Sequence, residues 1–344
     1  MYKDITIYDL AKVLNLSAAT ISRSLNNHPA INKNTKKRVI EKAEELGYRS
    51  NNFASNLRKQ KSQTIGVMVH ELNSSFITSV LAGIEKITAL ANYDLIIAHS
   101  SEMYSKEAAN ASNLFHKRVD GLIAALSFDT ENLEHFNPYF EKNIPVVFFD
   151  RVEENSKGTK VTIDNFKAGF EATKHLIDQG CKKIVHVTSN LKRNVYSLRY
   201  KGYLAALKEN NLPYEDDYLF ISDLKTKSGI EIANQIANMK PLPDGIFTTN
   251  DLTAALCIQV FKEKGVKIPE DVAIVGFNND ILSTIIEPQL TTINYPGMDI
   301  GEAAATHIIN QLRGNSLHNK TSSIVINSDL VIRGSSLKKR KNKL

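Results

Sequence analysis

The 344-residue sequence predicts an α/β protein with a small three-helix head and a larger body of two parallel-sheet lobes. The first observation is a pair of short, capped helical periods within the opening 27 residues. The second is an alternation of apolar strand-like runs with amphipathic helical runs from residue 64 onward, which starts again near residue 160. The third is charge. Residues 1–61 hold twelve Lys or Arg against five Asp or Glu, whereas residues 62–337 hold 26 against 32.

The stretch TIYDLAKVLNLSAATISRSLNN (6–27) predicts a helix-turn-helix. Thr6 and Asp9 have the spacing of an N-cap and an acidic N3 residue. Asn15 tolerates the left-handed conformation of a tight helix end, and Ser17 can cap the second helix. The apolar positions of one buried face are Ile7, Leu10, Ala11 and Leu14 in the first helix and Ile21 and Leu25 in the second. In such a unit the second helix enters the major groove of DNA with its N-terminal residues leading.

A third helix is expected from a cap at Asn32, Asn34 or Thr35 to Gly47. Its expected inward face is Val39, Ile40, Ala43 and Leu46. Four basic residues (Lys33, Lys36, Lys37 and Arg38) crowd its first turns, where they oppose the helix dipole. Contact with DNA phosphates would offset that cost, so the three helices together predict a DNA-binding head.

The motifs TIYDLAKVLNLSAATISRSLNN, INKNTKKRVIEKAEELGYRSN and ASNLRKQKSQTIGVMV resemble the lactose/galactose repressor (LacI/GalR) family of bacterial transcription regulators. The resemblance implies a head over 1–49, a hinge over 50–62, an effector-binding body over 63–334 and a basic tail over 335–344. The residues expected to contact DNA are Thr6, Ser17, Ala18, Ala19, Thr20, Ser22, Arg23, Asn26, Tyr48, Asn51, Ala54 and Leu57.

The hinge is expected to form a short helix only when two heads sit on one operator. By resemblance, Leu57 from each hinge would wedge into the minor groove beside Ala54 and kink the duplex. A core contact between Leu57 and the body is the alternative. Ser50 and Ser55 depart from the proline and arginine common at those positions, which would loosen the hinge or change its phosphate contacts.

The body predicts two Rossmann-like lobes, because continuous apolar strands between amphipathic helices indicate parallel sheets covered on both faces. Strands are expected at 64–69, 93–100, 120–126, 145–150, 160–164, 183–188, 217–222, 244–250 and 272–277, and helices at 75–91, 106–117, 168–179, 198–210, 229–239 and 253–264. The resemblance implies the type I periplasmic-binding-protein fold. Its lobes would span about 63–160 plus 293–323 and 161–292 plus 324–334, with the chain crossing between them near 291–294 and 320–330.

Ligands of open α/β sheets bind beyond the carboxyl ends of the strands, and polar residues gather at those ends here. By family resemblance, the residues expected to bind the effector are Ser74, Phe76, Ser100, Asp150, Asp164, Arg199, Leu224, Asn250, Asn278 and Tyr295. Carboxylates, guanidinium and amides suit hydroxyl-rich molecules, so a sugar or sugar derivative is the first expectation. Asn278, Leu224 and Tyr295 replace an aspartate, an aromatic residue and a glutamine found in relatives, which leaves a nucleobase, nucleoside or sugar phosphate open.

The sequence lacks the motifs that identify several other classes of protein. The sequence has no G-x-G-x-x-G, no Walker A motif and no G-x-S-x-G, so neither a cofactor nor a catalytic centre is expected. The histidines have no metal-site spacing, and Cys181 and Cys257 are expected to be buried thiols. With no signal peptide and no apolar run long enough for a membrane, the cytoplasm is the expected location. The rivals are a head fused to a sugar-modifying enzyme such as a kinase, and a solute-binding protein.

The expected mechanism is linkage between two sites. A homodimer would place two heads on a palindromic operator, and effector binding between the lobes would change the spacing of the hinges. The sign of the response stays open, because relatives respond to inducers or to corepressors. The tail SSLKKRKNKL has no leucine heptad, so a dimer is favoured over a tetramer and the tail is expected to be solvated.

Overall fold

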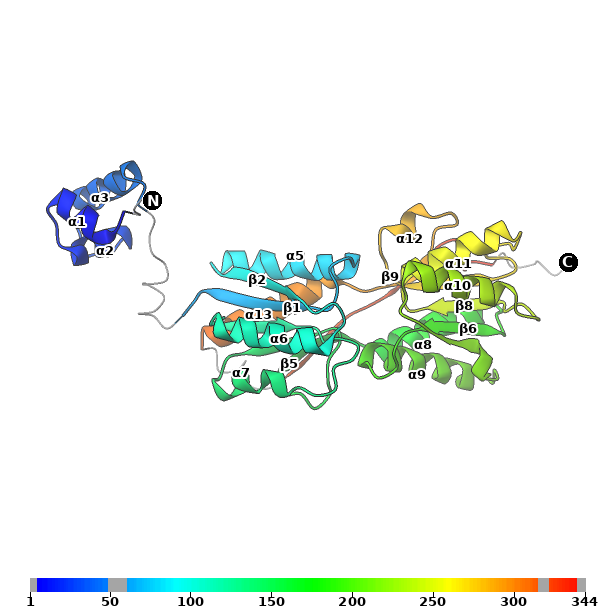
Figure 1. The fold of residues 1–344 in the computed structure, drawn as a ribbon. Helices are drawn as coiled ribbons and strands as arrows, with labels where there is room; N and C mark the ends of the chain where they lie inside the picture. Colours follow the sequence, from blue (N-terminus) through cyan, green and yellow to red (C-terminus); the bar gives the residue numbers. More distant parts are fainter. Residues whose placement is uncertain (1–4, 49–60, 315–321, 339–344) are drawn as a thin grey trace. The chain divides into compact units, whose positions relative to one another are not determined.

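The computed structural model describes residues 5–48, 61–314 and 322–338. The chain divides into two compact units, Met1–Ser62 and Gln63–Leu344, which we call the head and the body (Figure 1). The expected hinge contacts at Asn51, Ala54 and Leu57, with the departures at Ser50 and Ser55, lie outside the described residues. Most of the basic tail lies outside them too.

The head is the expected three-helix unit. Its helices are α1 (Ile7–Leu14), α2 (Ala18–Leu25) and α3 (Lys33–Glu45). Thr6 and Asp9 form a complete capping box at the start of α1, and Asn15 ends that helix in the left-handed region at φ 53°. The caps of α2 and α3 are Ser17 and Asn32, each accepting a backbone N–H three residues on. A small core of Leu10, Ile21, Val39 and Ala43 holds the helices together.

The expectation that Ile40 faces inward is wrong. Its side chain is 43% exposed, whereas Val39 and Ala43 are buried and Leu46 packs against the core. Positions 39, 43 and 46 already form one helical stripe, and Ile40 lies about 100° away from Val39 around the helix. The sequence gives two apolar neighbours, and the narrow core of so small a unit buries only one of them.

The first lobe of the body is a six-stranded parallel sheet in the order β11-β5-β4-β3-β1-β2. Its strands are β1 (Thr64–Val69), β2 (Asp94–His99), β3 (Gly121–Ala124), β4 (Val146–Phe149), β5 (Thr159–Ile163) and β11 (Ser323–Ile326). Its helices are α5 (Ser75–Leu90), α6 (Tyr104–His116), η1 (Glu134–Phe136), α7 (Asn137–Glu141) and α13 (Gly297–Leu312). Residues of α5 and α13 are buried with one face of the sheet, and residues of α6, η1 and α7 with the other.

The second lobe repeats the arrangement, with strand order β12-β10-β9-β8-β6-β7. Its strands are β6 (Ile184–Thr188), β7 (Leu219–Ile221), β8 (Gly245–Thr248), β9 (Ala273–Asn278), β10 (Thr291–Asn294) and β12 (Leu330–Val331). Among the described strands of this lobe, only the β10–β12 pair is antiparallel. Its helices are α8 (Asn165–Asp178), α9 (Asn194–Glu209), η2 (Asp216–Tyr218), α10 (Thr226–Ala237), α11 (Asp251–Glu263) and α12 (Leu282–Ile285). Cys181 and Cys257 are buried free thiols.

The chain passes between the lobes at three places in the described residues: after β5, between β10 and α13, and between β11 and β12. Figure 1 shows these connections running between the two sheets. Both β5 and β11 pair within the first sheet, so that lobe extends to residue 163 and again to residue 326, a few residues beyond the boundaries expected at 160 and 323. Ser335 and Ser336, expected to begin a solvated tail, are buried against the second lobe.

Candidate DNA-binding head and effector cavity

Helix α2 presents an open surface along its whole length, from Ala18 in its first turn to Asn26 at its C-cap. Ala19, Arg23 and Asn26 are exposed, and Ala18, Thr20 and Ser22 are partly exposed. The Ser17 hydroxyl caps the helix and also lies 2.9 Å from the Thr20 hydroxyl. Small side chains at 18 and 19 leave room for a base edge to approach, and Arg23 can donate to a base or a phosphate.

Three further head residues complete this description. Thr6 is exposed but its hydroxyl is committed to the capping box with Asp9. Tyr48 is half-buried and packs against the head core. The sequence analysis did not single out Tyr8, whose side chain on α1 is 74% exposed. An aromatic residue so exposed next to a helix-turn-helix cap is a candidate DNA contact that its aromatic character could have revealed.

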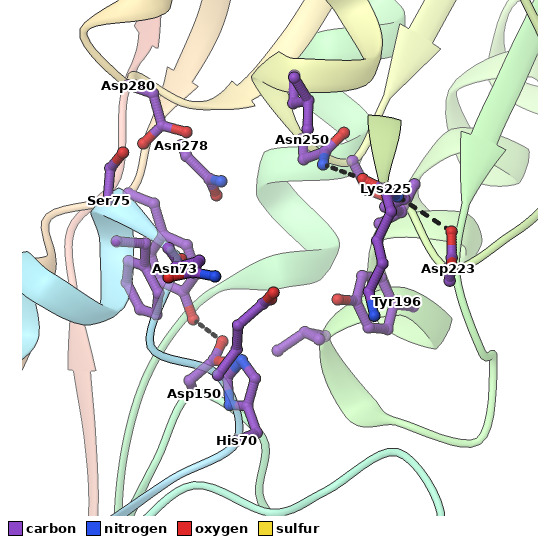
Figure 2. A pocket seen from close by; sticks show the side chains of 18 of the residues that line it. His70, Asn73, Ser75, Asp150, Tyr196, Asp223, Lys225, Asn250, Asn278 and Asp280 are labelled. Atoms are coloured by element: carbon purple, nitrogen blue, oxygen red, sulfur yellow. Dashed lines mark hydrogen bonds between the residues drawn. The ribbon is translucent and has the colours of Figure 1, made fainter. Parts of the chain in front are cut away.

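A cavity of about 690 Å³ lies in the body where the carboxyl ends of strands from both sheets face each other. Figure 2 shows side chains from both lobes lining it, with Asp150 and His70 from the first lobe and Tyr196, Asn250 and Asn278 from the second. Eight of the ten residues expected to bind the effector line this cavity: Ser74, Phe76, Asp150, Arg199, Leu224, Asn250, Asn278 and Tyr295.

Ser100 and Asp164 do not line the cavity, which corrects their expected placement. Ser100 is buried, donates its hydroxyl to the Val69 carbonyl and accepts from the Ser127 hydroxyl. Asp164 caps α8 by accepting the Lys167 N–H at 2.9 Å. Both residues follow strands, but each has a local structural partner, as strand-end polar residues often do.

A hydrogen-bonded Asp150–Tyr295 pair lines one wall of the cavity. The Tyr295 hydroxyl donates to Asp150 Oδ1 at 2.6 Å, and the Phe76 ring stacks on the Tyr295 ring with centroids 4.2 Å apart. Burial raises the pKa of Asp150, while Arg151, the Tyr295 hydrogen bond and Arg199 act in the opposite direction. Because Tyr295 lies between β10 and α13, a ligand that touches this pair also touches a connection between the lobes.

Arg199 is fixed on the second-lobe side. Its Nε donates to Asn165 Oδ1 at 2.8 Å, its Nη1 donates to the Thr249 carbonyl at 3.3 Å, and its guanidinium carbon lies 3.5 Å from the centre of the Phe277 ring. Burial lowers the pKa of Arg199, although nearby Tyr295, Tyr196 and Asp150 favour its charged form. The guanidinium is therefore positioned in advance and does not need the ligand to order it.

Arg151 joins the lobes along another wall. Its Nη1 contacts both carboxylate oxygens of Glu102, at 2.7 and 2.8 Å, and its Nη2 donates to the Tyr196 hydroxyl at 3.2 Å. The guanidinium also stacks over the Phe128 ring at 4.0 Å. Burial raises the pKa of Glu102 and lowers that of His70, whose Nε2 lies 4.0 Å from Glu102. The sequence analysis did not single out Arg151 as a binding residue.

The start of α9 fastens the second lobe to two loops of the first. Arg193 Nη2 donates to the Thr130 carbonyl at 2.8 Å, and Asn190 Nδ2 donates to the Phe128 carbonyl at 3.2 Å. Asn194 donates to the Asp150 carbonyl at 3.1 Å and accepts from the Val152 N–H at 3.0 Å. These bonds join the two lobes at one side of the cavity.

Several expected ligand groups are already committed within the protein. Asn250 caps α11 with its side-chain oxygen and donates its amide to the Leu224 carbonyl at 3.0 Å. Ser74 caps α5. Asp150, Leu224 and Asn278 have positive φ values of 58°, 58° and 116°. Non-glycine residues in that region store backbone strain, most of all Leu224, which has no polar side-chain group to bond its own backbone.

The described residues hold no group of three or more His, Cys, Asp or Glu side chains placed to bind a metal ion. Within the same part of the chain, no helix has the length and apolar character needed to cross a bilayer.

Comparisons with known proteins agree with this geometry. Residues 6–51 match the family described as bacterial regulatory proteins, lacI family, and residues 173–336 match a periplasmic binding protein-like domain. Catabolite control protein A of Priestia megaterium is 35% identical over 88% of this chain and 90% of its own length.

Two solved structures extend the comparison. A lac repressor dimer bound to operator and the anti-inducer ONPF aligns with a TM-score of 0.87 over 98% of this chain and all of that one, at 22% identity. A periplasmic binding protein/LacI transcriptional regulator from Alkaliphilus metalliredigens QYMF, complexed with D-xylulofuranose, aligns with a TM-score of 0.67 at 27% identity. It covers 80% of this chain and all of that one.

Proposed function

The chain belongs to the LacI family of bacterial regulatory proteins and is a DNA-binding transcriptional regulator; from that premise we propose that it is a homodimeric repressor controlled by a small molecule. The controlling molecule binds in the cavity between the lobes, and a sugar or sugar derivative is the favoured class. The main observation behind the proposal is the buried Asp150–Tyr295 pair beside Arg199. The pair lies between the two lobes, and Tyr295 belongs to one of the chain connections that join them.

The cavity chemistry supports a hydroxyl-rich ligand. A sugar hydroxyl can donate to Asp150 and accept from Arg199, and the stacked Phe76 and Tyr295 rings offer an apolar face to the sugar C–H groups. A relative with 27% identity is described as complexed with D-xylulofuranose, which agrees with this class. The relative Catabolite control protein A is named as a control protein, so catalysis forms no part of the proposal.

The head supports recognition of a palindromic operator. Its exposed α2 surface carries Ala19, Arg23 and Asn26, and two copies of it would read two half-sites related by a two-fold axis. The body would supply the dimer contact. Ile281 and Ile285 at α12 are each 71% exposed, an unusual exposure for large apolar side chains that a second copy would cover.

A binding experiment tests the proposal. Operator fragments are first selected from genomic DNA with the full-length protein, and their retention in gels is then compared with and without a panel of neutral sugars, sugar phosphates and sugar acids. A repressor with an effector site prefers particular fragments over random DNA, and at least one member of the panel changes that preference. The proposal fails if no fragment is preferred, or if no member of the panel alters the preference.

The same assay distinguishes a role of Arg199 in effector binding from a role in supporting the fold. Arg199→Lys should remove most of the effector response and leave operator binding intact, because the shorter ammonium cannot keep the bonds to Asn165 and Thr249. Lys201→Ala, an exposed change on the same helix, should respond like the natural protein. If Arg199→Lys loses operator binding as well, Arg199 supports the fold and does not act in effector binding.

A further inference from the structure

Resting on the proposed effector function, we propose that the effector is an anionic sugar derivative whose phosphate or carboxylate is bound by Lys225 at the second-lobe wall of the cavity. Lys225 comes directly before α10 and lines the cavity. Figure 2 shows its long side chain on the side of Tyr196 and Asn250, across the cavity from Asn73 and Asp150.

The first step is an account of the cations that line the cavity. Arg151 is paired with Glu102 and bonded to Tyr196, and Arg199 is held by Asn165, Thr249 and the Phe277 ring. Both guanidinium groups are buried and largely satisfied by protein partners. In the described part of the chain, the Lys225 ammonium has no hydrogen bond or ion pair, so it is the lining cation with its donors available.

The second step concerns the groups across from Lys225. Glu71, Asn73 and Ser75 line the first-lobe side, and their side chains have no hydrogen-bond partner among the described residues. Asn73 and Ser75 can bond hydroxyls, whereas Glu71 is anionic and contributes to raising the pKa of Glu102. An anionic group of the ligand therefore avoids the Glu71 and Glu102 side of the cavity and is attracted to the Lys225 side.

Asp223 is the acidic neighbour that could cancel the Lys225 charge. Its Oδ1 accepts hydrogen bonds from the backbone N–H of Lys225, at 3.0 Å, and from the Ser228 hydroxyl. The Ser228 bond is the main cause that lowers the pKa of Asp223, and the Lys225 charge adds a smaller effect. Figure 2 shows Asp223 beyond Lys225, on the side away from Asp150. Its carboxylate is therefore occupied by loop bonds, and the ammonium is left to face the cavity.

The test separates ligands by charge without requiring their identity. A bacterial metabolite extract is split by anion-exchange chromatography into a neutral and an anionic fraction, and each is added to the full-length protein. The anionic fraction should raise the melting temperature and change operator binding, whereas the neutral fraction should do neither. Phosphatase treatment of the anionic fraction distinguishes the sources: a phosphate effector loses its effect, and a carboxylate effector keeps it.

Variants connect the effect to the residue. Lys225→Gln should need about tenfold more of the anionic fraction for the same response, because one charge-assisted hydrogen bond is lost. Lys225→Arg should restore most of the response. Lys227→Gln removes an exposed lysine in the first turn of α10 that does not line the cavity, so it should behave like the natural protein.

The outcomes separate this inference from the proposed function. If the neutral fraction alone changes operator binding, the protein has an effector and the inference about its charge is wrong. If Lys225→Gln and Lys227→Gln weaken the response equally, Lys225 acts only through general surface charge and the inference is again wrong. If neither fraction changes operator binding, the proposed effector function fails as well.

Discussion

At the scale of single residues, the buried carboxylates of the body behave differently according to their partners. Asp150 has the Tyr295 hydroxyl and two arginines nearby, which oppose the effect of burial on its pKa. Asp251 is fully buried, accepting the Thr292 hydroxyl at Oδ1 and the Asp280 N–H at Oδ2, at 2.6 and 2.7 Å. No arginine or lysine is among the influences on Asp251, and burial raises its pKa to about 7.

This shift makes stability depend on pH. The unfolded chain loses the Asp251 proton near pH 4, whereas the folded protein keeps it up to about pH 7. The folded state therefore holds more protons within that range, and its stability falls as pH rises from about 4 to about 7. Asp251→Asn cannot ionise, so the variant should lose less stability over this range, as measured by urea unfolding at pH 4.5, 6 and 7.5.

Asp299→Asn provides the control for this measurement. Asp299 is exposed in the first turn of α13, and its neutralisation should leave the pH dependence of unfolding unchanged. Parallel pH profiles for Asp251→Asn and the natural protein would contradict the assignment of the slope to Asp251.

Single residues also show where sequence reasoning reaches its limit. The residues of the helix-turn-helix caps are predictable because a cap depends on a local pattern of three or four residues, as Thr6 and Ser17 show. The cavity position of Arg199 came from family resemblance, and its stacking on Phe277 depends on distant chain segments. The sequence also did not reveal that the Asn250 side chain caps a helix and bonds the Leu224 carbonyl. An asparagine at a strand end can serve as a helix cap or as a ligand contact, and the residue type does not say which.

At the scale of elements, each lobe contains a pair of helices that touch at glycines on both sides. In the first lobe Gly83 of α5 and Gly301 of α13 lie against the backbone of the facing helix, and in the second lobe Gly169 of α8 and Gly202 of α9 do so. A Cβ built on Gly169 would lie 2.3 Å from the carbonyl oxygen of Arg199. The close contact of α8 with α9 therefore fixes the backbone that carries the cavity arginine.

Gly169→Ala should push α9 away from α8. We expect a loss of about 1–3 kcal/mol in the free energy of unfolding, the usual cost of overpacking a tight contact, together with a weaker effector response. Urea unfolding of the full-length protein measures the first effect, and effector titration in the operator assay measures the second. Lys167→Ala, an exposed change on α8, should cost less than about 0.5 kcal/mol. Unchanged unfolding in Gly169→Ala would mean that the helices can separate freely.

Element boundaries reveal a second limit of sequence reasoning. Helices α8 and α9 begin at Asn165 and Asn194, before the expected starts at 168 and 198. The first turns mix polar residues with apolar ones (Phe166 in α8, Val195 and Tyr196 in α9), so the prediction set both starts too late, and helix starts are the least certain part of such an assignment. No helix was predicted for α13, and β11 was divided between the lobes by the expected boundary. Pairing with β5 is a long-range contact that local periodicity does not encode.

At the scale of the whole molecule, the proposed dimer makes a prediction about exposed apolar residues. Ile285 is 71% exposed, and Ile221 on the same lobe is 56% exposed. If α12 lies in the dimer contact, Ile285→Asp should shift the protein from dimer to monomer in sedimentation and weaken operator binding much more than nonspecific binding. Ile221→Asp introduces the same charge at β7 and should leave the dimer intact. Dimers of both variants at micromolar concentration would place the contact elsewhere.

The last prediction concerns the connection between the two binding events. If the effector changes operator affinity by some factor, the operator must change effector affinity by the same factor. A practical switch needs about a hundredfold preference, or roughly 2.7 kcal/mol. Effector affinity is measured by calorimetry on the full-length protein with operator duplex present, and again with random duplex of equal length. The two affinities should differ by the factor seen in the operator gels, and equal affinities would show that occupancy of the cavity and of the head are independent.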